Sequence, residues 1–158
     1  MPTFTIETPQ QFFEGIVAPD VTEFLERELS HRSAYHACNS LLSYRDWVVQ
    51  KHSGKVWSIN RVTQGPLGET GKFQEALNAY DRSFGIVREI ANFSKHVTAS
   101  SPVLHEVHAP GAGPRNEAPS GAMKRVFTIE MGTESHDVRD SVQTAFVEWQ
   151  KLNRENSW

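Results

Sequence analysis

The chain has 158 residues, of which 38% are hydrophobic and 22% charged, and this balance predicts one globular domain spanning residues 1–158. A formal net charge of −3 with scattered basic residues excludes the Lys/Arg surplus that is typical of a duplex-binding domain. No run reaches the roughly 18 apolar residues of a membrane helix, and no leader is visible at the start. Cys38 is the single cysteine, which excludes an intramolecular disulfide, and we expect a cytoplasmic protein.

Helical periodicity begins close to the start of the chain. Residues 8–11, with the sequence TPQQ, are typical of a helix start with an N-cap threonine and a capping box closed by Gln11. Pro19 predicts a kink or turn, after which a second helical segment is expected to end near Ser30. Apolar residues at three- and four-residue spacing then predict a long helix over residues 32–50.

A loop and two further helices are expected in the middle of the chain. Residues 52–71 are rich in Gly, Ser and Thr, so we expect a loop there, with a short strand around Trp57 as the alternative. Helix resumes near residue 72 and breaks near Ser83, which is expected to cap a new helix over residues 84–97. Apolar residues cover one half of this last helix, as in an amphipathic helix that lies on a core.

One β-hairpin and a last helix follow. Residues 103–108 and 124–131 are predicted to be strands, and the Pro/Gly-rich segment 109–121 between them a flexible hairpin loop. Residues 135–153 keep one apolar face and predict the final helix. The fold class is therefore mainly α, a helical bundle of about four to five helices with one β-hairpin before the C-terminal helix. Because an isolated hairpin is marginal in water, this one must pack on a helix or pair with a partner's edge.

Arg88, Asn92, Lys95 and His96 form the polar strip that most resembles a ligand site. Offsets of four, seven and eight residues gather these side chains on one face of a single helix. Two cations, an amide and an imidazole suit a phosphate-bearing ligand or phosphoryl-transfer chemistry. The alternative is the solvated half of an amphipathic helix, with Lys95 and His96 beside the negative end of its dipole.

A second polar set lies on the helix predicted over residues 32–50. Its titratable members, His36 and Asp46, would meet Arg88 or His96 if the two helices pack side by side. The candidate catalytic residues are therefore His36, Asp46, Arg88, Asn92 and His96. The alternative is a buried hydrogen-bond network, or an ion pair that fixes the register of the helices.

The remaining histidines form no metal motif. His105 and His108 lack the zincin spacing, and on a strand they are expected to point to opposite faces. Gly-rich phosphate loops and dinucleotide fingerprints are missing from the sequence as well. We therefore expect neither a metal nor a cofactor.

Four segments carry a family resemblance: YHA at 35–37, DWV at 46–48, IANFSKH at 90–96 and FVEW at 146–149. Together they resemble a set of uncharacterised bacterial helical proteins that share an ANxxKH helix, a family that implies no established activity. The chain is also similar, more faintly, to the HEPN superfamily of helical bundles, some of which are ribonucleases. The HEPN hallmark places four to six residues between Arg and His, whereas seven separate Arg88 from His96 and three separate Arg32 from His36.

These observations favour a non-enzymatic helical interaction protein, which binds a protein partner or a second copy of itself as a homodimer. The alternative is binding of a phosphate, nucleotide or other small anionic ligand, or HEPN-like RNA cleavage, at a polar site between two helices. Neither a membrane partner nor strong nucleic-acid binding is indicated. The residues alone do not decide whether the chain is an enzyme.

Overall fold

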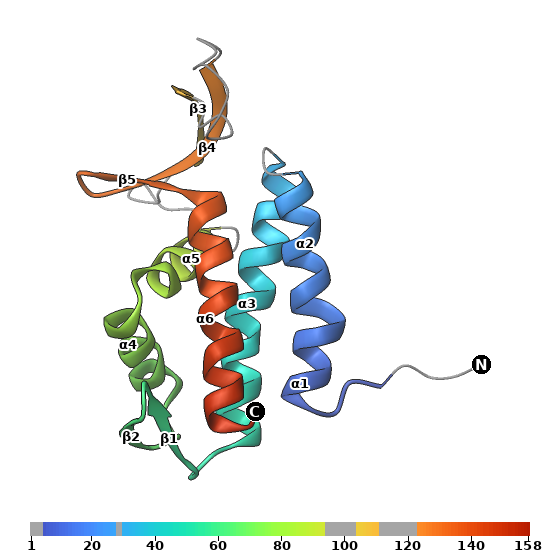
Figure 1. Cartoon of the computed structure of the whole chain (residues 1–158), viewed down its shortest axis with the longest axis vertical. Coiled ribbons are helices and arrows are strands. Elements are labelled where there is room, and N and C mark those ends of the chain that lie inside the picture. The colour runs from blue at the N-terminus through green and yellow to red at the C-terminus, as the bar shows by residue number, and fades with distance from the viewer. Residues whose placement is uncertain (1–4, 28–29, 94–103, 111–122) are drawn as a thin grey trace, which may run out of the picture.

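The computed structural model describes residues 5–27, 30–93, 104–110 and 123–158, and it confirms a mainly helical fold with antiparallel strands. The helices are α1 (Pro9–Phe12), α2 (Ala18–Glu26), α3 (His31–Lys51), α4 (Thr70–Tyr80), α5 (Arg82–Phe93) and α6 (Val138–Asn156). α3 and α6 lie side by side at the centre, with α2 on one side and α4 and α5 on the other (Figure 1). Among the described residues, no helix combines the length and apolar character that crossing a bilayer requires.

The first helical stretch begins as its sequence predicts. The Thr8 side chain accepts a hydrogen bond from the Gln11 backbone N–H, and the Gln11 side chain accepts one from the Thr8 backbone N–H, which confirms the capping box. Its end differs from the prediction, because α2 stops at Glu26. Ser30 is instead the N-cap of α3, where its side chain accepts from the N–H of Ser33.

The interruption predicted at Pro19 takes the form of a π-helical turn, η1 (Phe13–Val17), which joins α1 directly to α2. In this turn the Ala18 N–H donates to the Phe13 carbonyl, one residue further back than in an α-helix. Proline has no N–H for the usual bond to the carbonyl four residues earlier. The changed hydrogen-bond spacing just before Pro19 lets the helix continue past it.

The break between α4 and α5 lies where the sequence places it, but its cap is a different residue. The carboxylate of Asp81 accepts the backbone N–H of Ser83 at 2.8 Å, so Asp81 takes the capping role expected of Ser83. Ser83 itself is buried. α5 is described as far as Phe93, and residues 94–97 of the predicted helix lie outside the described residues.

A second hairpin stands where a loop was expected, so the strand alternative is the correct one. β1 (Val56–Ile59) and β2 (Val62–Pro66) pair antiparallel on either side of Asn60 and Arg61, whose φ angles are 50° and 67°. Two consecutive positive φ angles are typical of a type I′ turn, which usually needs Gly or Asn. Here the Glu155 carboxylate of α6 accepts both turn N–H groups, and this distant contact stabilises the turn.

The side chain of Asn156 in α6 binds the backbone of the same hairpin. Its side chain accepts the Ser58 N–H at 2.8 Å and donates to the Ser58 carbonyl at 2.9 Å. We expect Asn156→Ala to lower the free energy of unfolding by about 1–3 kcal/mol, because two partly buried backbone groups lose their partner. Urea unfolding followed by circular dichroism measures this. Thr144→Ala, an exposed change on α6, is the control, and an equal effect of both variants would contradict the role of Asn156.

The predicted hairpin before the last helix is confirmed and gains a third strand. β3 (Leu104–Pro110), β4 (Met123–Met131) and β5 (Glu134–Asp137) form an antiparallel sheet in that order. β5 occupies the start of the predicted final helix, since Asp137 is the N-cap and accepts the Asp140 N–H at 3.1 Å. The loop expected at 109–121 begins within β3, and residues 111–121 lie outside the described residues.

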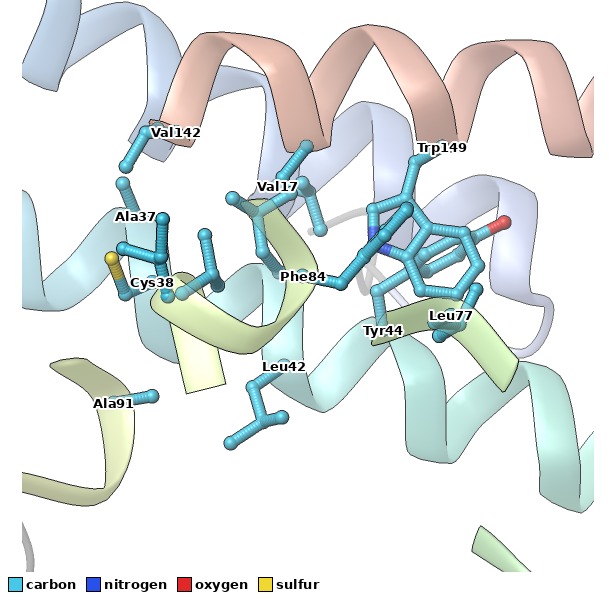
Figure 2. Packing of buried hydrophobic residues seen from close by; sticks show 14 of the residues in the cluster. Val17, Ala37, Cys38, Leu42, Tyr44, Leu77, Phe84, Ala91, Val142 and Trp149 are labelled. Atoms are coloured by element: carbon cyan, nitrogen blue, oxygen red, sulfur yellow. The ribbon is translucent and has the colours of Figure 1, made fainter. Parts of the chain in front are cut away.

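One hydrophobic core fills the space between the helices. Trp149 lies at its centre, with the rings of Tyr44 and Phe84 at centroid distances of 4.9 and 5.3 Å. Figure 2 shows these side chains with Leu77, where α3, α4, α5 and α6 meet. Cys38 is buried in the same core, and burial raises the pKa of its thiol, so it packs as a small hydrophobic residue.

Candidate functional site

The predicted polar strip lies only partly within the described residues. Arg88 is exposed on α5, and Asn92, one turn later, is half-buried. Lys95 and His96 lie outside the described residues. The phosphate site that these four residues would form therefore stays a prediction.

His36 and Asp46 both lie at exposed positions of α3. Ten residues separate them, which corresponds to about 15 Å along a helix axis. α3 does pack against α5, as the predicted site requires. Asp46, however, pairs with its neighbour Arg45, whose Nε and Nη2 donate to one carboxylate oxygen at 2.9 and 2.7 Å.

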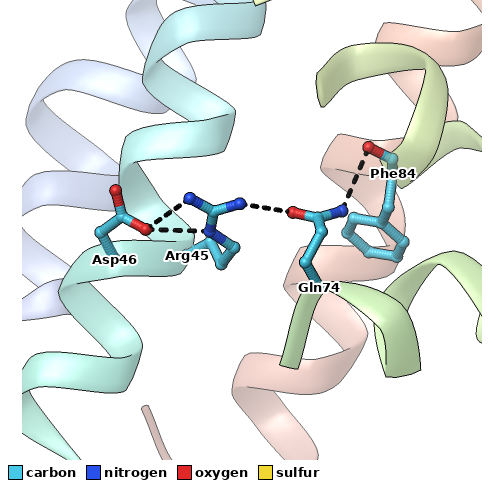
Figure 3. Close-up of polar contacts among 4 residues, drawn as sticks. All are labelled: Arg45, Asp46, Gln74 and Phe84. Carbon is cyan, nitrogen blue, oxygen red and sulfur yellow. Dashed lines mark hydrogen bonds and ion pairs between the residues drawn. The ribbon is translucent and has the colours of Figure 1, made fainter. Parts of the chain in front are cut away.

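Arg45 also connects α3 to α4 and α5 (Figure 3). Its Nη1 donates to Gln74 Oε1 at 2.8 Å, and Gln74 Nε2 donates to Asn78 Oδ1 at 2.6 Å and to the Phe84 carbonyl at 3.5 Å. Gln74 is only 5% exposed, so its amide depends on these partners. Asp46 and its neighbour Arg45 thus belong to a network between helices, but its buried partner is Gln74 of α4, not His36, Arg88 or His96.

A buried carboxylate, Glu148, was missed by the sequence reasoning. It is 9% exposed, accepts a hydrogen bond from the Tyr80 hydroxyl of α4, and accepts another from Lys151 Nζ at 2.6 Å. Burial and then the Glu148 carboxylate raise the pKa of Tyr80, which keeps the hydroxyl protonated as a donor. The sequence signal that could have identified Glu148 is its charge beside Trp149, on the apolar side of the helix predicted over residues 135–153.

A second electrostatic cluster joins β5 to the start of α5. Arg82 forms an ion pair with Glu134, and His136 Nε2 lies 3.5 Å from Glu134 Oε2. Burial, and then the positive charge of Arg82, lower the pKa of His136 below its ordinary value of 6.5. The folded protein therefore holds this imidazole neutral at a pH where the unfolded chain binds a proton.

We expect the melting temperature to fall as the pH drops from about 7 to about 5, because the unfolded state then binds more protons than the folded state. His136→Gln should reduce this dependence, as measured by calorimetry across that range. Part of the dependence should remain, since burial and Lys55 also lower the pKa of His52. The exposed His36→Gln is the control, and an unchanged pH dependence in His136→Gln would contradict the assignment.

Metal ligation finds no support in the part of the chain that the structure describes. There, no group of three or more His, Cys, Asp or Glu side chains is placed to hold a metal ion. His105 and His108 both belong to β3.

The geometry defines a helical protein with a projecting antiparallel sheet. No family model, curated protein or solved structure matches the chain. The resemblances to bacterial ANxxKH proteins and to the HEPN superfamily therefore stay predictions.

Proposed function

We propose that the protein is a non-enzymatic interaction protein whose partner strand, in the first instance from a second copy of the chain, pairs with β3. The supporting observation is that β3 is the edge of its sheet, with no strand among the described residues on its outer side. In Figure 1, β3 and the adjoining part of β4 extend beyond the end of the helices. An edge strand presents unpaired N–H and C=O groups that an added strand can pair with.

The other end of the sheet is fixed to the helical body. Phe127, Thr128 and Ile129 of β4 are buried, with exposed fractions of 3%, 9% and 1%. β4 and β5 both contact α6, and Asp137 connects β5 to the first turn of that helix. The strand that pairs with β3 is therefore attached to the helices at one end, and a preformed edge lowers the entropic cost of binding a further strand.

Two adjacent proline substitutions test the edge. Neighbouring residues of a strand alternate in the direction of their N–H, so Glu106→Pro and Val107→Pro remove one N–H facing β4 and one facing outward. We expect one variant to keep the native melting curve and lose self-association, and the other to lower the melting temperature. Size-exclusion chromatography with light scattering, over a range of concentrations, measures the association.

Two results would count against this function. A strict monomer at the highest concentration would remove self-association, and the protein would then need a different partner strand. Association that survives in both proline variants, with folding intact, would show that another surface makes the contact.

The alternative function, binding of a phosphate or nucleotide ligand, has one observation in its favour. Arg88 is exposed on α5 and has no ion-pair partner within the described ranges, and Asn92 lies one turn away. If this function is correct, Arg88→Ala should abolish nucleotide binding in a titration and leave the melting temperature unchanged. Lack of nucleotide binding and of RNA cleavage in the unsubstituted protein would exclude both the ligand site and the HEPN-like activity.

A further inference from the structure

A pocket of about 250 Å³ lies between the first helical stretch and the end of α6, and it is separate from β3. Its volume falls below the roughly 300 Å³ at the lower end of drug-sized sites, so a ligand there is small. Two aromatic rings, two opposite charges and three amides line it: Phe13, Trp158, Glu14, Arg154, Gln10, Gln150 and Asn153.

The two charged residues of this pocket do not form an ion pair with each other. Glu14 and Arg154 are both exposed, and neither forms an ion pair with any residue in the described part of the chain. Gln10, another pocket residue, donates to Glu14 Oε1 at 2.9 Å, which orients the carboxylate and leaves Oε2 to accept from a ligand. A carboxylate and a guanidinium that share a small pocket are complementary to a zwitterion.

The apolar part of the pocket is preformed. Phe13 is 7% exposed, stacks on Phe146 at 5.2 Å and touches the Tyr44 ring at 4.9 Å, so its position is fixed by packing. Trp158 is held on the opposite side by contacts with Phe73 at 5.9 Å and with other aromatic rings of the core. Between them the site offers an aromatic surface for an apolar side chain.

Asn153 completes the polar part of the pocket. Its Oδ1 accepts the hydroxyl of the buried Tyr44 at 2.8 Å, which leaves the Nδ2 group to donate to a ligand. Phe13 and Glu14, on the other side, belong to the π-helical turn η1. Such turns are rare within helices and recur at functional sites.

We infer that this pocket binds a free α-amino acid with an aromatic or large aliphatic side chain. Arg154 takes the carboxylate, Glu14 takes the ammonium group, and the side chain lies against Phe13 and Trp158. The inference does not depend on strand pairing at β3.

Isothermal titration with L-phenylalanine and L-leucine tests the site, with phenethylamine and 3-phenylpropanoate as ligands that each lack one charge. We expect a Kd at or below about 1 mM for at least one amino acid, and binding at least about tenfold weaker for the amine and the acid. Arg154→Gln and Glu14→Gln should each weaken amino-acid binding by about tenfold or more. Both residues are exposed, so the melting temperature should not change.

The controls are Arg32→Gln and Glu26→Gln, which remove exposed charges on α3 and α2 and should leave binding intact. The inference is overturned if neither amino acid binds with a Kd at or below about 1 mM. It is also overturned if binding persists unchanged in Arg154→Gln and Glu14→Gln, or if the amine or the acid binds as well as the amino acid.

Discussion

Trp149→Ala is expected to lower the free energy of unfolding by about 3–5 kcal/mol. The indole is 1% exposed and contacts the rings of Tyr44, Phe84 and Phe73 at 4.9, 5.3 and 6.0 Å. Its removal leaves a cavity where four helices meet, and aromatic side chains on rigid helices cannot fill it. Since small domains are stable by about 5–15 kcal/mol, this variant should be partly unfolded at modest urea concentrations.

Urea unfolding followed by far-UV circular dichroism measures this loss. Val147→Ala is the matched control, because Val147 lies two residues earlier on α6 and is 38% exposed. We expect it to change stability by less than about 1 kcal/mol. A loss below about 1 kcal/mol for Trp149→Ala, or equal losses for the two variants, would place the centre of the core elsewhere.

Ile129→Ala is expected to cost about 2–5 kcal/mol, because this β4 residue is 1% exposed in the part of the sheet that lies on the helices. It has a second effect that Trp149→Ala lacks. In the sheet, Ile129 is paired with Leu104 of β3 on one side and with His136 of β5 on the other. Loss of its buried side chain should therefore loosen the attachment of the projecting edge to the helices. Self-association should therefore weaken while the helical content stays close to that of the unsubstituted protein.

Circular dichroism, thermal melting and light scattering on the same samples separate these effects. Thr133→Ala, an exposed change in the β4–β5 turn, is the control and should leave all three unchanged. If Ile129→Ala melts at the native temperature, β4 is not anchored through this residue. If it is destabilised but associates normally, the binding surface does not depend on the attachment of the sheet.

The helices were largely predictable because their signals are local. Apolar spacing along α3 and α6 shows which side is buried, and the capping box at Thr8 and Gln11 needs only residues close in sequence. The elements that the sequence did not predict depend on contacts between residues far apart in the chain. The β1–β2 turn has Arg61 at its second positive φ angle and is held by Glu155, 95 residues beyond Asn60, so local signals offered its strand only as an alternative.

The candidate site was less predictable than the fold, since spacing places residues on one helix face without showing what covers it. Asp46 was expected to face a residue of another helix, yet its bonds go to the adjacent Arg45. The pairing of Glu148 with Tyr80 joins residues 68 apart in the sequence. The only sequence signal for this pair was the charge of Glu148 on an apolar helix face.

Hydrogen exchange of residues 104–110, at two protein concentrations about a hundredfold apart, tests strand pairing at β3 most directly. Amides that point outward from an unpaired edge exchange with solvent, and pairing with another strand protects them. We expect exchange in β3 to slow at the higher concentration while exchange in α3 stays the same. Equal exchange of β3 at both concentrations would contradict self-association through this edge.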